Sequence, residues 1–135
     1  MPGAFCMTDP RLRQIAWLAR IALALVFIWH GVVPKILWLS PDELVMIQVH
    51  NLPVPEWVAR IAGLAEIILG LLLLWRRQRW PLLLAGLLLI GLLLDVALFS
   101  PHLLLQAFNP LSTNLAALAL CWVAWRAETP QSLPH

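Results

Sequence analysis

The chain has 135 residues, of which 61% are hydrophobic and only 12% are charged. This composition excludes a water-soluble globular domain, because the apolar residues fall into long runs that one small core cannot bury. The net charge of +2 is small and no basic cluster alternates with aromatic residues, which excludes a nucleic-acid-binding protein. Cys6 and Cys121 show neither CxxC nor metal-ligand spacing, so we expect two free thiols and no metal site.

Four long apolar segments follow one another along the chain. They cover residues 15–39, 57–75, 80–100 and 111–125, and each is near the length needed to cross a hydrocarbon layer of about 30 Å. We therefore predict an all-α integral membrane bundle of four antiparallel transmembrane helices, forming a single membrane domain over residues 1–135.

A short extra helix is predicted between the first two segments. Ser40-Pro41-Asp42-Glu43 supplies an N-cap, a proline at the first helical position and a capping-box glutamate. The prolines at 53 and 55 stop the helix that these residues start. We expect a short amphipathic helix over residues 41–50, in the first outer loop.

Arginines gather on one side of the predicted spans. The group that flanks the start of the first span is Arg11, Arg13 and Arg20. Further arginines fill the turn at residues 76–79 and follow the fourth segment, whereas the other two loops are poor in basic residues. The positive-inside rule then makes both termini and this turn cytoplasmic. Tryptophans near the segment ends agree with an aromatic belt at each interface, namely Trp17, Trp38, Trp57, Trp75, Trp80 and Trp125.

Polar side chains inside the predicted spans are the candidates for function, because a charged group in lipid is expensive. The ionisable ones are His30, Lys35, Glu66 and Asp95. Asn109 and Asn114 add polar atoms from the fourth segment, and Trp29 also lies well inside its span. With a rise of about 1.5 Å per residue, the polar groups fall into one layer in the outer half of the bundle.

The backbone around this layer is predicted to be irregular. Pro34 lies one turn after His30 and removes a helical hydrogen bond, which predicts a kink. Irregular backbone at membrane depth is tolerated only where protein or a water-filled cavity satisfies it, so the kink indicates a polar pocket. Gly63, Gly70 and Gly91 are expected to place the two carboxylates on faces that pack against neighbouring helices.

Two interpretations of the polar layer are open. In the first, His30 pairs with Asp95 or Glu66, Lys35 pairs with another acid, and the network only specifies how the helices assemble. In the second, an open pocket holds a small ligand, with His30 exchanging protons near neutral pH and a carboxylate orienting it. The kink and the two asparagines favour the pocket.

Several of the polar residues also have simpler explanations when taken singly. An asparagine before a proline is a good helix cap, and a lysine near the membrane surface can serve as an anchor. These explanations cover Asn109 as a cap, Lys35 as an anchor, and His50 and His102 as ordinary loop histidines.

The same residues resemble a family motif. The chain is similar to the DoxX-like family of small four-helix bacterial membrane proteins through His30-Gly-Val-Val-Pro-Lys35, Gly63-Leu-Ala-Glu66, and Phe108-Asn-Pro110 with Asn114. The resemblance implies a four-helix bundle in the bacterial inner membrane, with relatives that serve as the membrane subunit of a thiosulfate:quinone oxidoreductase. This chain has no cysteine-rich or nucleotide-binding motif, which argues against an independent oxidoreductase activity.

The resulting hypothesis is a membrane subunit that binds a small lipophilic molecule, of quinone type by the resemblance, and supports a partner oxidoreductase. Its catalytic residues would be His30 as the proton-exchanging group and Asp95 and Glu66 as its acidic partners. The ligand contacts would be Lys35, Trp29, Asn109 and Asn114. The alternatives are a non-catalytic membrane assembly or stability factor, and a small-molecule carrier that acts as a homo-oligomer.

Overall fold

The computed structural model describes residues 9–129, and the regular structure within them is entirely helical. This confirms the predicted all-α class, while Cys6 lies outside the described residues. The elements in chain order are α1 (Pro10–Val32), η1 (Val33–Leu37), α2 (Pro41–Gln48), α3 (Pro55–Trp75), α4 (Trp80–Phe99), η2 (Pro101–Leu105) and α5 (Pro110–Ala127).

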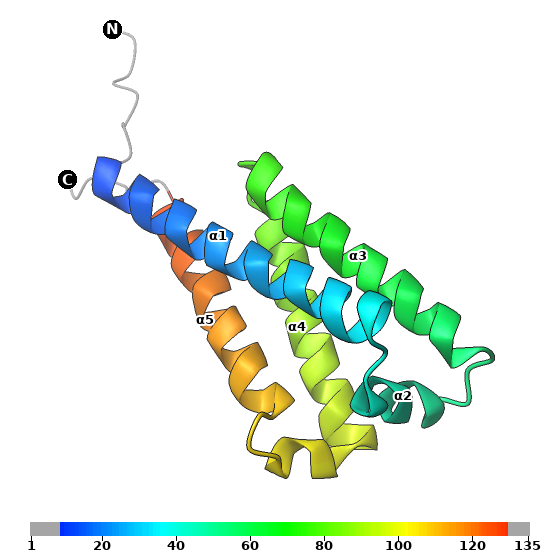
Figure 1. Cartoon of the computed structure of the whole chain (residues 1–135). Helices are drawn as coiled ribbons and strands as arrows, with labels where there is room; N and C mark the ends of the chain where they lie inside the picture. The colour runs from blue at the N-terminus through cyan, green and yellow to red at the C-terminus, as the bar shows by residue number, and fades with distance from the viewer. Residues whose placement is uncertain (1–8, 130–135) are drawn as a thin grey trace, which may run out of the picture.

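The four long helices alternate in direction (Figure 1). The start of α1, the α3–α4 turn and the end of α5 lie together at one end, which we call the arginine-rich end after the residues of the 76–79 turn. α2 and η2 lie at the opposite end, which we call the far end. α1 packs mainly against α3 and α5, and α4 packs mainly against α5.

Within residues 9–129, three helical segments are long and apolar enough to cross a membrane, namely Pro10–Leu37, Pro55–Trp75 and Trp80–Phe99. Large apolar side chains on them are exposed, for example Leu98 at 74% and Trp75 at 78%, as expected for surfaces that face lipid. α5 does not reach the same mean hydropathy, because Ser112 to Asn114 and Arg126 interrupt its apolar sequence. A fourth crossing by α5, and the orientation of the termini, stay predictions.

Helix starts follow the local sequence closely. Asp9, Ser40 and Asn109 precede helical prolines, and their side chains accept hydrogen bonds from the backbone N–H groups of the first turns of α1, α2 and α5. The predicted helix at 41–50 is confirmed as α2, which ends at Gln48.

The irregularity predicted at Pro34 takes the form of a π-helical turn, η1. The N–H of Trp38 donates to the carbonyl oxygen of Val33 at 2.9 Å, which is the wider spacing of a π turn. The helix therefore widens at Pro34 instead of ending, and it continues to Leu37. Lys35 lies within this widened turn and is buried, with 8% of its surface exposed.

Two glycines let α1 and α3 approach closely. A Cβ atom at Gly63 would lie 2.7 Å from the carbonyl oxygen of Gly31 and 2.9 Å from the Cβ of Lys35, too close for any side chain. This contact brings Glu66, one turn along α3, next to Lys35. The packing role predicted for Gly91 is wrong, because a Cβ there would meet no atom within 4 Å.

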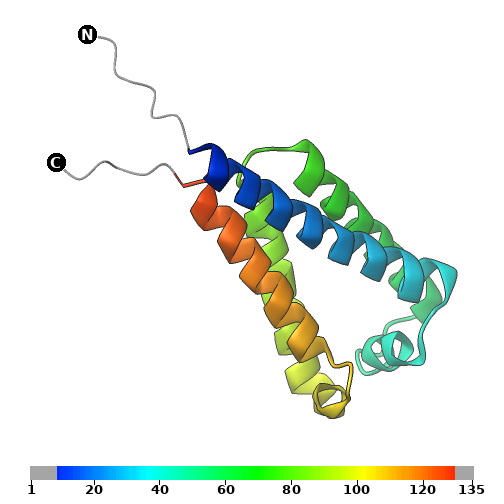
Figure 2. The ribbon, with the colours of Figure 1, turned by 60° about the vertical axis from the view of Figure 1, so that its left-hand side comes forward.

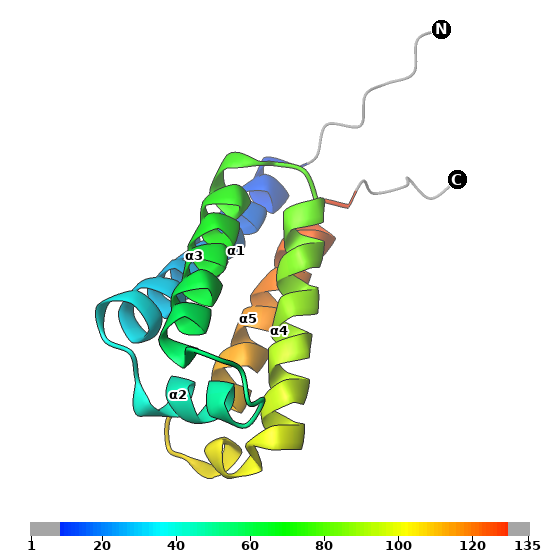
Figure 3. The same ribbon diagram turned by 90° about the vertical axis from the view of Figure 1, so that its right-hand side faces the viewer.

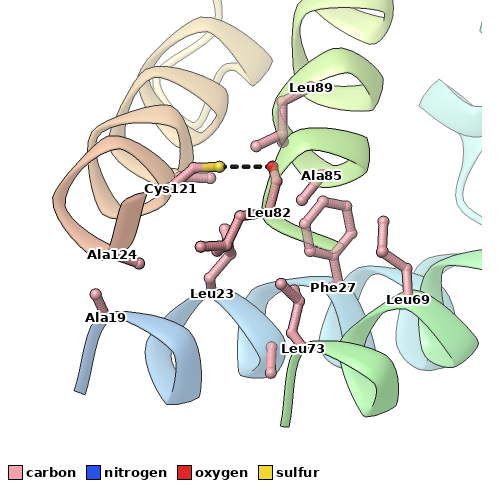
Figure 4. Close-up of a cluster of buried hydrophobic side chains, with 12 residues drawn as sticks. Ala19, Leu23, Phe27, Leu69, Leu73, Leu82, Ala85, Leu89, Cys121 and Ala124 are labelled. Carbon is pink, nitrogen blue, oxygen red and sulfur yellow. Dashed lines mark hydrogen bonds between the residues drawn. The ribbon is translucent and has the colours of Figure 1, made fainter. Parts of the chain in front are cut away.

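The apolar core fills the half of the bundle toward the arginine-rich end (Figure 4). Leu23 and Phe27 of α1 meet Leu73 of α3 and Leu82 of α4, each of them at most 2% exposed. Cys121 of α5 is a free cysteine whose thiol donates to the carbonyl oxygen of Leu82 at 2.9 Å.

A buried arginine joins the helix ends just beyond this core. Arg20 is 2% exposed, and its guanidinium binds the carboxylate of Glu128 after α5. It also donates to the carbonyl oxygens of Leu73, Arg76 and Gln78 at the end of α3 and in the following turn. The sequence interpretation grouped Arg20 with the arginines that flank the first span, but the structure places it inside the bundle.

Candidate functional site

A cavity of about 440 Å³ occupies the far end of the bundle, where the apolar core stops. All five α-helices contribute to its wall, and α2 lies across the space between the α1–α3 pair and the α4–α5 pair (Figures 2 and 3). Its apolar wall includes Met46, Ile47, Leu92, Val96 and Phe108.

The six polar residues predicted to share one layer all line this cavity, namely His30, Lys35, Glu66, Asp95, Asn109 and Asn114. Trp29 does not line it and is 66% exposed on the surface of α1. The sequence placed Trp29 inside the span correctly, but a helix has an outer face as well as an inner one. Trp29 is therefore removed from the candidate site.

The centre of the site is a lysine held by two carboxylates. The Nζ of Lys35 lies 2.8 and 2.9 Å from the two oxygens of Glu66 and 3.2 Å from Oε1 of Glu43. The three side chains are only 8%, 7% and 15% exposed. The interpretation of Lys35 as a surface anchor is wrong, because its amine points into the bundle.

This cluster has one more negative than positive group when both carboxylates are ionised. Burial raises the pKa of the Glu43 carboxyl, and the charge of Lys35 only partly offsets that effect. A proton on Glu43 leaves the balanced pair of Lys35 and Glu66. The cluster therefore holds a proton more readily than an exposed glutamate does.

A second side-chain contact ties the turn after α2 to α4. Nε2 of His50 lies 3.0 Å from Oδ1 of Asp95, and the His50 ring packs edge-on against Phe99 with 4.7 Å between ring centroids. The interpretation of His50 as an ordinary loop histidine is therefore wrong. The expected pairing of His30 with Asp95 or Glu66 is wrong as well, because those carboxylates bind His50 and Lys35.

Two of the predicted site residues, His30 and Asn114, are not held by any other side chain in the part of the chain that the structure describes. Within residues 9–129 neither side chain makes a hydrogen bond or ion pair, although both line the cavity. Asn109 differs, since its Oδ1 accepts from the N–H of Ser112 at 2.8 Å and its Nδ2 donates to the carbonyl of Gln106 at 2.9 Å. The amide of Asn109 thus serves as the predicted cap.

Sequence reasoning missed Glu43 and His50 as members of the site. Glu43 occupies the third helical position after Ser40, and its N–H does donate to Ser40 Oγ at 3.2 Å. Its carboxylate, however, turns to Lys35 instead of closing a capping box. The available signal was that the predicted segment 41–50, beside the polar layer, contains both a glutamate and a histidine.

Metal binding has no support within residues 9–129, where no three His, Cys, Asp or Glu side chains lie close enough to share an ion.

Comparison with known proteins gives one result: the sequence profile of the DoxX-like family matches residues 24–122, a stretch that contains His30, Glu66, Asp95 and Asn114. No curated protein and no solved structure matches the chain.

Proposed function

Given that this chain belongs to the DoxX-like family, we propose that it is a membrane subunit that binds a small lipophilic molecule of quinone type in the far-end cavity. In this proposal the far end faces outward from the bacterial inner membrane, since the arginine-rich end is retained in the cytoplasm. Electrons for a quinone would come from a partner oxidoreductase, because the chain has no redox motif of its own.

The observation that carries the proposal is that His30 and Asn114 line the cavity without a partner among residues 9–129, beside apolar side chains such as Phe108. A cavity of about 440 Å³ falls within the size range of small-molecule sites, which combine an apolar lining with a few placed polar groups. Both side chains can donate a hydrogen bond to a carbonyl oxygen, which is what a quinone ring presents.

Proton exchange is the chemistry that this wall would add. Reduction of a quinone to a quinol takes up two protons with two electrons, and an imidazole titrates in the range where such protons are exchanged. We assign His30 as the group that contacts the ligand and exchanges protons. Glu66 and Asp95 then act as positioning residues, because each already holds a basic side chain, Lys35 and His50 respectively.

The test is binding of a short-chain ubiquinone or menaquinone analogue to purified protein, measured by equilibrium dialysis. Replacing His30 with Ala is expected to weaken binding about tenfold, the effect of losing one good hydrogen bond to the ligand. The matched control is His102→Ala, since His102 is exposed and lies outside the cavity. Equal affinity of wild type and His30→Ala, or no saturable binding at all, would refute the proposal.

A second function is favoured by the way Lys35 is closed on Glu66 and Glu43. Buried charges that satisfy each other specify helix assembly without any ligand. A non-catalytic assembly or stability factor would need nothing more. In that case His30→Ala lowers the folded yield, and neither wild type nor variant responds to the quinone analogue.

A further inference from the structure

A second cavity, of about 300 Å³, lies at the arginine-rich end and plays no part in the proposed quinone site. The start of α1, the end of α5 and the 76–79 turn form its wall. Its polar side chains are Arg13, Trp17, Arg20, Arg77 and Glu128. Three guanidinium groups and one carboxylate give this small space a net charge of +2.

The charge of Arg20 in this cavity is already neutralised by Glu128. Nε and Nη2 of Arg20 lie 2.5 and 2.9 Å from the two oxygens of Glu128, and the other guanidinium bonds go to backbone carbonyls. Arg20 and Glu128 thus shape the cavity without offering charge to a ligand. The positive charge that remains belongs to Arg13 and Arg77.

Arg13 and Arg77 are uncommitted donors in the part of the chain that the structure describes. Neither side chain makes an ion pair or hydrogen bond there, and Arg77 only lies over the ring of Trp17, 5.2 Å from its centroid. A planar guanidinium matches the oxygens of a phosphate, and two of them around one cavity suit a phosphate group.

The surroundings identify what kind of phosphate fits. Four tryptophans lie near the arginine-rich ends of their helices, namely Trp17, Trp75, Trp80 and Trp125. Tryptophans at the ends of membrane helices are typical of the level of the lipid head groups. A second, mostly apolar groove adjoins the cavity and shares Arg13 and Trp17 with it, and Leu18 in that groove is 68% exposed. A polar cavity beside an apolar groove matches a molecule with a charged head and an acyl chain.

We propose that this cavity binds the phosphate head group of an anionic phospholipid. Arg13 and Arg77 donate to the phosphate oxygens, and an acyl chain lies along the groove next to Leu18. The site would fix the arginine-rich end of the bundle in the membrane, independently of any ligand at the far end.

The experiment measures phospholipid binding to delipidated full-length protein in detergent by native mass spectrometry. Phosphatidylglycerol is compared with phosphatidylcholine, and inorganic phosphate is added as a competitor. The double variant Arg13→Gln/Arg77→Gln is set against Arg60→Gln/Arg126→Gln, which removes the same charge. Arg60 and Arg126 also stack on tryptophans, Trp57 and Trp122, but line neither depression.

We expect wild type to prefer phosphatidylglycerol, and the first double variant to lose that affinity about tenfold while the control changes less than about twofold. Equal loss in both double variants would overturn the proposal in favour of diffuse surface charge. Complete competition by millimolar inorganic phosphate would overturn it in favour of a free-anion site. Thermal unfolding of each variant checks that all of them fold, which is expected because the four arginines are exposed.

Discussion

The ion cluster around Lys35 gives the sharpest test of the structure. Lys35→Met keeps the length and apolar part of the side chain and removes only the charge. It leaves the buried Glu66 and the partly buried Glu43, at 7% and 15% exposure, with no cation in contact among residues 9–129. Removing one partner of a buried ion pair destabilises a protein by about 3–5 kcal/mol, against about 0–1 kcal/mol for an exposed pair.

Because Lys35 contacts two carboxylates, the loss of stability depends on which member of the cluster is replaced. Glu66→Gln leaves Lys35 with Glu43 at 3.2 Å, so we expect a smaller loss, about 1–2 kcal/mol. The double variant Lys35→Met/Glu66→Gln removes both charges of the closest pair and should recover most of the stability that Lys35→Met loses. The free energy of unfolding can be measured in mixed micelles with increasing SDS, followed by tryptophan fluorescence.

The control is Arg60→Met, a change of the same kind at an exposed cation on α3, for which we expect less than about 0.5 kcal/mol. The reasoning is refuted if Lys35→Met lowers the free energy of unfolding by no more than this control does. It is also refuted if the double variant shows no coupling, since Lys35 would then reach the membrane surface instead of the carboxylates.

Three further predictions concern other parts of the bundle. Gly63→Ala should lower the free energy of unfolding by about 1–3 kcal/mol because its Cβ meets the α1 backbone, whereas Gly91→Ala, in open space, should have no effect or stabilise; equal effects would contradict this contact. Arg20→Lys should lose about 2–3 kcal/mol in the same assay because an ammonium cannot bind Glu128 and the helix-end carbonyls together, and a neutral result would contradict the buried position. Burial raises the pKa of Glu43 above its ordinary 4.5, so stability should fall as the pH rises through that raised value; Glu43→Gln should flatten the profile between pH 4 and 8, and parallel profiles would refute it.

Much of the fold could be predicted because its signals are local. Long apolar runs specify membrane helices, and the caps at Ser40 and Asn109 depend only on neighbours in sequence. The polar layer was predictable too, because helical rise alone sets the depth of residues such as His30 and Glu66. The match to the DoxX-like family over residues 24–122 agrees with the resemblance that these motifs suggested.

The partners of those polar residues could not be predicted. Lys35 meets Glu66 across 31 residues of sequence, and Arg20 meets Glu128 across 108. Such pairs depend on which faces of different helices turn toward each other, and that rotation is decided by close contacts such as the one between Gly31 and Gly63.

By itself, then, the sequence determined that the protein is helical, apolar and suited to a membrane, and that its polar groups share one level along the helices, because hydropathy and helical rise act along one chain. Only the tertiary structure decided that His30 and Asn114 stay open to a cavity while Lys35 and Asp95 are occupied. It did so by bringing α2 and the turn after it over the bundle, where Glu43 reaches Lys35 and His50 reaches Asp95.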